Sequence, residues 1–165
     1  MPIGLEAFVF FVNGQNPVND LSVEEVRDIY AGEYTNWSEV GGVNRTINPL
    51  SRLEGSGSQS AMEAFMKGRE IAPKSPFALT GASIGFSFRY YMDGIVNNDD
   101  VKMLSLNGIY PDEENIKSRE YPVVMEFYAI YREDNPNENI RALIDWILSD
   151  EGQTLIEESG YVRIN

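Results

Sequence analysis

The seven residues from Arg52 to Ser58, Arg-Leu-Glu-Gly-Ser-Gly-Ser, constrain most strongly what this chain can fold into. A short apolar run, Ile47 to Leu50, precedes them, and apolar residues at helical spacing follow from Gln59. The segment therefore predicts a tight turn from a strand into a helix. The unpaired amides that begin such a helix, together with its dipole, favour a negatively charged group. Glycine in the turn lets the backbone approach a ligand closely.

Two interpretations of this turn stay open from the residues alone. In the first, backbone amides, hydroxyls and a guanidinium form an anion cradle whose ligands are Arg52, Ser56, Gly57 and Ser58. Gly55 would then support the turn. In the second, Gly-Ser-Gly-Ser is an ordinary surface loop. Glu54 either holds the guanidinium of Arg52 in place or neutralises it at the surface.

The charge balance and the missing residue types exclude several classes of function. Thirteen basic and 26 acidic residues give a net charge of −13, which argues against nucleic acid or an anionic membrane as partner. The chain has no cysteine and no histidine, so a cysteine-based zinc site, a disulfide, a thiol nucleophile and a Ser-His-Asp triad are excluded. No lysine completes a nucleotide-binding loop after Gly55-Ser56-Gly57. We therefore expect no enzyme, no cofactor and no metal.

Strand and helix patterns alternate along the 165 residues, which predicts an α/β fold. Strands are expected at 6–13, 47–50, 81–88, 101–106 and 123–131. Helices are expected at 23–31, 58–67, 89–95, 111–118, 140–147 and from 150 to Gly160, with a loop over 67–80. Ser22 and Glu25 form a capping-box pattern. No apolar stretch approaches the roughly 20 residues that cross a bilayer, and no export signal is visible.

A few residues invite a functional interpretation that we do not adopt. Trp37 and Trp146 are expected to pack in the core rather than to form ligand platforms. Ser83 and Arg89 could approach a cleft, but core packing is the expected role of their segment. The acidic loop 134–138 resembles a calcium loop only superficially, because its third position is proline and the required glycine is missing. A turn is expected there.

The order of the segments resembles the phosphate-binding component of bacterial ABC phosphate importers. The matching segments are Leu21–Gly32, Thr35–Trp37, Gly41-Gly42, Arg52–Ser58, Ser83–Phe86 and Trp146–Val162. The resemblance implies a type II periplasmic-binding-protein fold, in which two α/β lobes joined by hinge strands close on a ligand. It also implies that Arg52, Ser56, Gly57 and Ser58 bind phosphate. Ser58 stands where the family has threonine, so the hydroxyl is kept and only a methyl group is lost.

Only the second half of the family's pattern matches this chain. The resemblance then implies a single unit over 1–165, with a first hinge strand at 6–13 and a complete ligand-binding lobe at 14–120. Residues 121–165 would supply the return hinge strand and the C-terminal helices of an incomplete other lobe. We therefore expect a trimmed polypeptide or a natural half-protein. Its phosphate affinity should be weak, because each lost charge-assisted hydrogen bond costs roughly 1.5–3 kcal/mol. The helix at Ile140–Leu148 should repack against the lobe or drive self-association.

The function implied is that of an extracytoplasmic solute-binding protein, or a fragment of one, that binds inorganic phosphate for ABC-transporter uptake. Its partners would be the permease subunits, and its location the periplasm or the cell surface. One alternative is another tetrahedral oxyanion, such as sulfate, molybdate or tungstate, because the family's aspartate that selects protonated phosphate belongs to the half without a match. Another alternative is a signalling or adhesion module that keeps the fold without transport.

Overall fold

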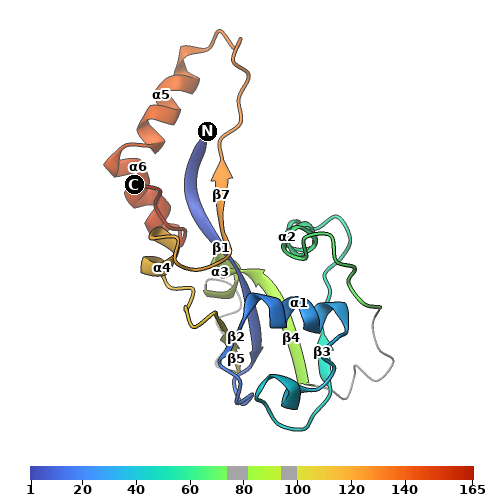
Figure 1. Ribbon diagram of the computed structural model, residues 1–165. Helices are drawn as coiled ribbons and strands as arrows, with labels where there is room; N and C mark the ends of the chain where they lie inside the picture. Colours follow the sequence, from blue (N-terminus) through green and yellow to red (C-terminus); the bar gives the residue numbers. More distant parts are fainter. Residues whose placement is uncertain (74–81, 94–99) are drawn as a thin grey trace.

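The computed structural model describes residues 1–73, 82–93 and 100–165, and its elements form a mixed α/β fold, as predicted (Figure 1). The strands are β1 (Pro2–Asn13), β2 (Asp20–Leu21), β3 (Ile47–Pro49), β4 (Ala82–Phe88), β5 (Val101–Met103), β6 (Ser105–Leu106) and β7 (Val124–Tyr128). The helices are α1 (Val23–Ala31), the 3-10 helix η1 (Trp37–Val40), α2 (Gly57–Phe65), α3 (Arg89–Tyr91), α4 (Glu113–Lys117), α5 (Glu138–Ile147) and α6 (Asp150–Glu158).

The long strand β1 runs through both parts of the molecule (Figure 1). One part holds β7, α5 and α6, and the other holds β3, β4, α1 and α2. Its first half pairs antiparallel with β7, and its second half pairs antiparallel with β4 and, at its end, with β5. The apolar run predicted as a buried strand is confirmed, but β1 begins at Pro2 rather than at residue 6. Proline and glycine are weak strand formers, which hid this extension. The ring of Phe127 lies over Gly4, where a Cβ atom would come within 2.2 Å of it.

An aromatic cluster joins α1 and α2 to one face of the sheet. The ring centroids of Phe10 and Phe65 lie 5.0 Å apart, and those of Tyr30 and Phe86 lie 5.6 Å apart. The Tyr30 hydroxyl donates to the carbonyl of Ile84 at 3.2 Å, so this buried polar group is satisfied. The cluster fixes the position of α2, because Phe65 lies in its last turn.

Helix α1 forms where the local pattern predicts it. Ser22 Oγ accepts from the amide of Glu25 at 3.1 Å, and the Glu25 carboxylate accepts from the amide of Ser22 at 2.7 Å. Gly32 ends the helix with a φ of 80°, a left-handed conformation that glycine adopts without strain. Trp37 is fully buried and its Nε1 donates to the carbonyl of Ala82 at 2.9 Å, which confirms its packing role.

The single strand predicted at 101–106 is wrong, because the structure divides it. Residues of β5 pair with β1, whereas β6 pairs in parallel with β2. Leu104 lies between them, fully buried, and its amide donates to the carbonyl of Phe10 at 2.8 Å. Alternation alone cannot show that a segment changes its partner strand. The predicted strand start at Gly81, the predicted helix end at Ile95 and the part of the predicted loop after residue 73 lie outside the described residues.

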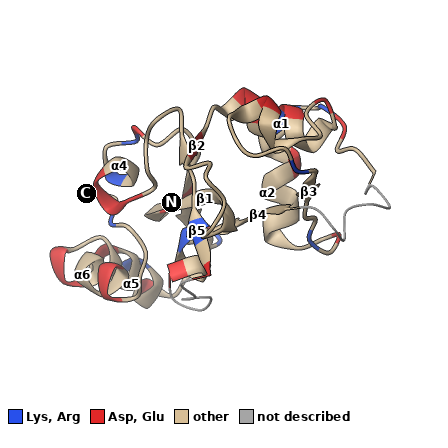
Figure 2. Cartoon of the chain, turned by 90° about the horizontal axis from the view of Figure 1, so that it is seen from below, with Lys and Arg blue, Asp and Glu red and all other residues tan. Residues whose placement is uncertain are grey.

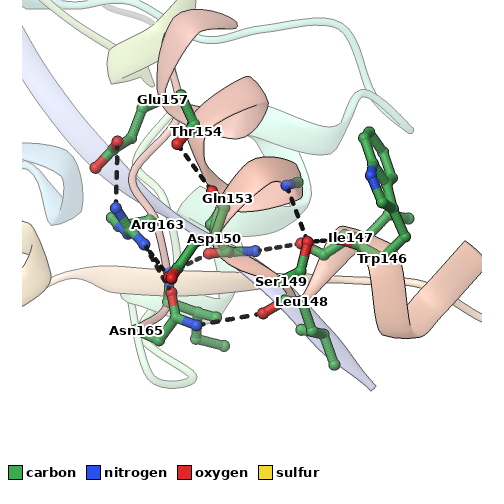
Figure 3. Close-up of polar contacts among 12 residues, drawn as sticks. Trp146, Ile147, Leu148, Ser149, Asp150, Gln153, Thr154, Glu157, Arg163 and Asn165 are labelled. Atoms are coloured by element: carbon green, nitrogen blue, oxygen red, sulfur yellow. Dashed lines mark hydrogen bonds and ion pairs between the residues drawn. The ribbon is translucent and has the colours of Figure 1, made fainter.

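Gln153 connects the C-terminal helices to the rest of the chain (Figure 3). Its side chain is fully buried; Nε2 donates to the carbonyls of Ile3 and Ile147 at 2.9 and 3.0 Å, and Oε1 accepts from the amide of Ile164 at 2.8 Å. This one residue therefore ties β1, α5 and the last residues to α6.

The outer face of α5 leaves apolar side chains uncovered. Leu143 is 55% exposed and Trp146 43% exposed, so the core packing expected for Trp146 is wrong. Figure 1 places α5 at the end of the molecule away from α1 and α2, so α5 does not repack against that part. None of the described helices combines the length and the apolar character that crossing a bilayer requires.

Candidate functional site

The candidate site is formed by the segments that follow two neighbouring parallel strands. Strands β3 and β4 are adjacent and parallel; β3 leads into the loop before α2, and β4 leads into α3. Ligands of α/β folds bind at the carboxyl ends of parallel strands. The two connections meet here, because the guanidinium carbon of Arg52 lies 5.9 Å from the ring centroid of Tyr91 in α3. This distance is typical of a cation–π contact.

The turn before α2 has the geometry that its sequence predicts. Gly55 has a φ of 78°, in the left-handed region that favours glycine. Ser56 is the N-cap, and its Oγ accepts from the amide of Gln59 at 3.3 Å. Helix α2 therefore begins at Gly57, one residue before the predicted start, and the strand–turn–helix order is confirmed.

The first turn of α2 is open to a ligand. Within the described part of the chain, no group accepts a hydrogen bond from the amides of Gly57 or Ser58. Gly57 is exposed, and a Cβ atom built on it would meet nothing within 4 Å. Arg52 is also exposed, whereas Ser58 is only 8% exposed and lies mostly beneath the turn. This corner, formed by Arg52 and the first turn of α2, therefore presents Gly57 and the Arg52 side chain to solvent. The amides of Gly57 and Ser58 there have no hydrogen-bond acceptor among the described residues.

The first turn of α2 differs in charge from the first turns of most other described helices. Its first turn holds no acidic residue, whereas the first turns of α1, α4, α5 and α6 each hold one or two. Figure 2 shows α2 largely uncharged beside helices that carry red acidic bands. In a chain of net charge −13, the positive end of the α2 dipole is thus left without a nearby carboxylate in its own first turn.

Glu54 does not form an ion pair with Arg52 in the part of the chain that the structure describes. The carboxylate is exposed on the loop, and the guanidinium contacts Tyr91 instead. Two residues at this corner were missed by sequence reasoning. Gln59 had a signal, because it completes a Ser-x-x-Gln capping pattern with Ser56. Tyr91 had none, because its contact depends on where β4 ends.

Ser83 and Arg89, which might have approached a cleft, are held elsewhere. Ser83 Oγ accepts from Asn48 Nδ2 at 3.0 Å and lines a cavity of about 640 Å³ whose lining includes none of the candidate ligands. Arg89 Nε lies 3.1 Å from the Asp93 carboxylate. The described residues include no cluster of three or more acidic side chains that could hold a metal ion. The turn expected at 134–138 lies at the beginning of that segment: the amide of Asn135 donates to the carbonyl of Arg132 at 3.2 Å, and Arg132 pairs with Asp134. Glu138 already belongs to α5.

A buried carboxyl group lies where β1 passes from β7 to β4. Burial raises the pKa of Glu6 to about 7, although the amides of Ala7 and Tyr90 and the charge of Arg89 oppose the shift. Asp93 raises this pKa further. One oxygen accepts from the amide of Ala7 at 2.8 Å, and the other has no hydrogen-bond partner among the described residues.

The family model and the curated relatives that match this chain indicate the same family. A model described as a PBP superfamily domain matches residues 1–151. The phosphate-binding protein PstS of Borreliella burgdorferi is 26% identical over 96% of this chain and 63% of its own length. PstS of Bacillus subtilis is 26% identical over 93% of this chain and 53% of its own length. The chain therefore spans less than two thirds of these curated relatives.

Solved structures agree with this comparison. A substrate-binding protein from Clostridium perfringens with bound phosphate is 29% identical, with a TM-score of 0.80, over 100% of this chain and 71% of that chain. An ABC-type phosphate transport receptor from Vibrio cholerae is 26% identical, also with a TM-score of 0.80, over 98% and 71%. The mixed α/β architecture is thus that of the type II binding-protein fold, present here in part.

Proposed function

This chain belongs to the PBP superfamily, and on that premise we propose that it binds inorganic phosphate at the corner formed by Arg52 and the first turn of α2. The observation that carries the proposal is the open first turn of α2, which holds no acidic residue although the chain is strongly acidic. The names of the relatives support phosphate as the oxyanion.

The donors at this corner match the chemistry of a phosphate anion. The guanidinium of Arg52 offers forked N–H donors. The amides of Gly57 and Ser58 are donors at the N-terminus of α2, where the helix dipole is positive. Ser56 Oγ already accepts from Gln59, so its own hydroxyl hydrogen can be donated to a phosphate oxygen. Gly55, in its left-handed conformation, shapes the loop that carries these groups, whereas Glu54 lies exposed on it.

We infer a binding role in transport rather than catalysis. The relatives are named as phosphate-binding proteins and as a phosphate transport receptor. By this analogy the chain forms part of an extracytoplasmic receptor that delivers phosphate to the permease subunits of an ABC importer. Residues 14–120 would form its ligand-binding lobe, and the strands at 6–13 and 123–131 its hinge.

We also propose that copies of this chain associate through α5. Leu143 and Trp146 leave an apolar face uncovered there, and water disfavours such a face. A second α5 packed against it would remove both side chains from solvent. The ligand corner is on the other part of the molecule, so association leaves it accessible.

Calorimetric titration with phosphate tests the proposed function. We expect Arg52→Met to weaken binding by about tenfold or more, because a charge-assisted hydrogen bond contributes roughly 1.5–3 kcal/mol. Arg45→Met removes the same charge from an exposed site beside the 640 Å³ cavity and should bind as the unmodified chain does. Equal losses in both variants would contradict the site. Sulfate that competes as well as phosphate would show a general oxyanion site instead.

A further inference from the structure

Among the described helices, three begin with the same four-residue pattern. An N-cap side chain that accepts a hydrogen bond is followed, three residues later, by Glu or Gln in the pairs Ser22/Glu25, Asn36/Glu39 and Ser56/Gln59. In α1 and η1 the third helical residue bonds back to the N-cap amide, at 2.7 Å in both cases. These two helices therefore close the ordinary capping box.

The capping box at α2 is incomplete, because Gln59 does not accept from the N-cap amide. Ser56 Oγ accepts from the amide of Gln59, as usual, but the amide of Ser56 donates to the carbonyl of Leu53 at 3.1 Å. The Gln59 Oε1 instead accepts from the amide of Arg52 at 3.1 Å. The third residue of the helix thus holds the arginine that lies four residues before the N-cap.

We propose that Gln59 is a positioning residue that pre-organises Arg52 for the oxyanion, an inference that rests on the proposed phosphate site. The residues from Arg52 to Gly55 are exposed, so the loop has little packing of its own. A loop that must be ordered when the ligand binds costs affinity. The hydrogen bond to Gln59 fixes the backbone of Arg52, and the contact with Tyr91 restricts the positions that the Arg52 guanidinium can take.

The lack of charge on the Gln59 side chain also favours binding of the oxyanion. Glu25 and Glu39 occupy the equivalent place in α1 and η1, where no anion is expected. A glutamate at position 59 would accept the same hydrogen bond but would place a negative charge beside the anion. Glutamine supplies the acceptor without that repulsion. Both the position of Arg52 and the affinity for phosphate therefore depend on Gln59.

Two variants separate these contributions. Gln59→Met keeps the length of the side chain and removes the acceptor, whereas Gln59→Glu keeps an acceptor and adds a charge. NMR would measure the water-exchange rate of the Arg52 amide, and titration of the same samples with inorganic phosphate would measure affinity. Glu25→Met removes the equivalent acceptor from α1 and is the matched control for helix stability.

We expect Gln59→Met to speed exchange of the Arg52 amide and to weaken phosphate binding, each by about three- to tenfold, as loss of one hydrogen bond implies. Gln59→Glu should keep the slow exchange and still bind phosphate more weakly, and Glu25→Met should change neither quantity. Unchanged exchange in Gln59→Met, or faster exchange with unchanged affinity, would overturn the positioning role. No phosphate binding by the unmodified chain, with faster exchange in Gln59→Met, would refute the proposed function while leaving the loop tether established.

Discussion

The rings of Tyr90 and Tyr161 stack with their centroids 4.5 Å apart and their planes 10° apart. Tyr90 belongs to α3, next to the tyrosine that contacts Arg52, and Tyr161 follows α6. The ring centroid of Phe127 in β7 lies 4.8 Å from the ring centroid of Tyr161. This stack therefore joins the part of the molecule that carries the candidate site to the C-terminal helices.

A double-mutant cycle should show that the stack couples these two parts. We expect Tyr90→Leu and Tyr161→Leu to have a coupling free energy of about 0.5–1.5 kcal/mol, the usual contribution of an aromatic pair beyond its burial. Urea unfolding of the four proteins measures it. Additive effects of the two substitutions would mean that the contact contributes nothing to stability.

Glu6 should make the protein less stable as the pH rises. Burial raises the pKa of Glu6 from the ordinary value of 4.5 to about 7, so the folded chain holds a proton that the unfolded chain releases. Its contribution to stability is therefore complete below pH 4.5 and is lost as the pH rises to about 7. Above that pH, Glu6→Gln should be more stable by roughly 2–4 kcal/mol, and the two proteins should converge in acid.

Thermal or urea unfolding across this pH range provides the measurement. Glu120→Gln removes one negative charge at an exposed position and controls for the change in net charge. Parallel pH profiles for the unmodified chain and Glu6→Gln would refute the effect of burial on the Glu6 carboxyl group.

Gln153 should be among the most sensitive positions in the chain. Gln153→Met keeps the volume but leaves the carbonyls of Ile3 and Ile147 and the amide of Ile164 without this partner. We expect a loss of roughly 3 kcal/mol, because each buried polar group left unpaired costs about 1–3 kcal/mol. Gln15→Met makes the same change at an exposed residue. A similar, small effect of both substitutions in urea unfolding would show that the network does not stabilise the fold.

The apolar face of α5 should drive self-association. Sedimentation should show a mass that increases with protein concentration, and Leu143→Lys with Trp146→Lys should restore the monomer. Val43→Lys adds a charge at another exposed apolar position, away from α5, and should not change the mass. A monomer at all concentrations of the unmodified chain would contradict the proposal.

The sequence predicted best the elements whose determinants are local. The limits of α1 follow from Ser22, Glu25 and Gly32, which all lie within one helix length of each other. The turn before α2 could be predicted for the same reason, since Gly55 and Ser56 act on their immediate neighbours. Local hydrogen bonds and backbone preferences need no knowledge of the tertiary fold.

Features that depend on contacts across the fold could not be predicted. Tyr91 reaches Arg52 only because β3 and β4 run parallel and adjacent, so the segments that follow them continue in the same direction. The burial of Glu6 depends on the residues that cover β1 at the point where its partner strand changes. Trp146 is a large aromatic residue and is expected in the core for that reason, but the sequence does not show how much of α5 another element covers.

An oxyanion should bind the amides that begin α2. Titration of isotope-labelled protein with phosphate, followed by NMR, tests it most directly. We expect the largest shifts at the amides of Gly57 and Ser58 and at Arg52, and we expect Arg52→Met to reduce all of them. Shifts concentrated around the cavity beside Arg45, or no shift at millimolar phosphate, would contradict it.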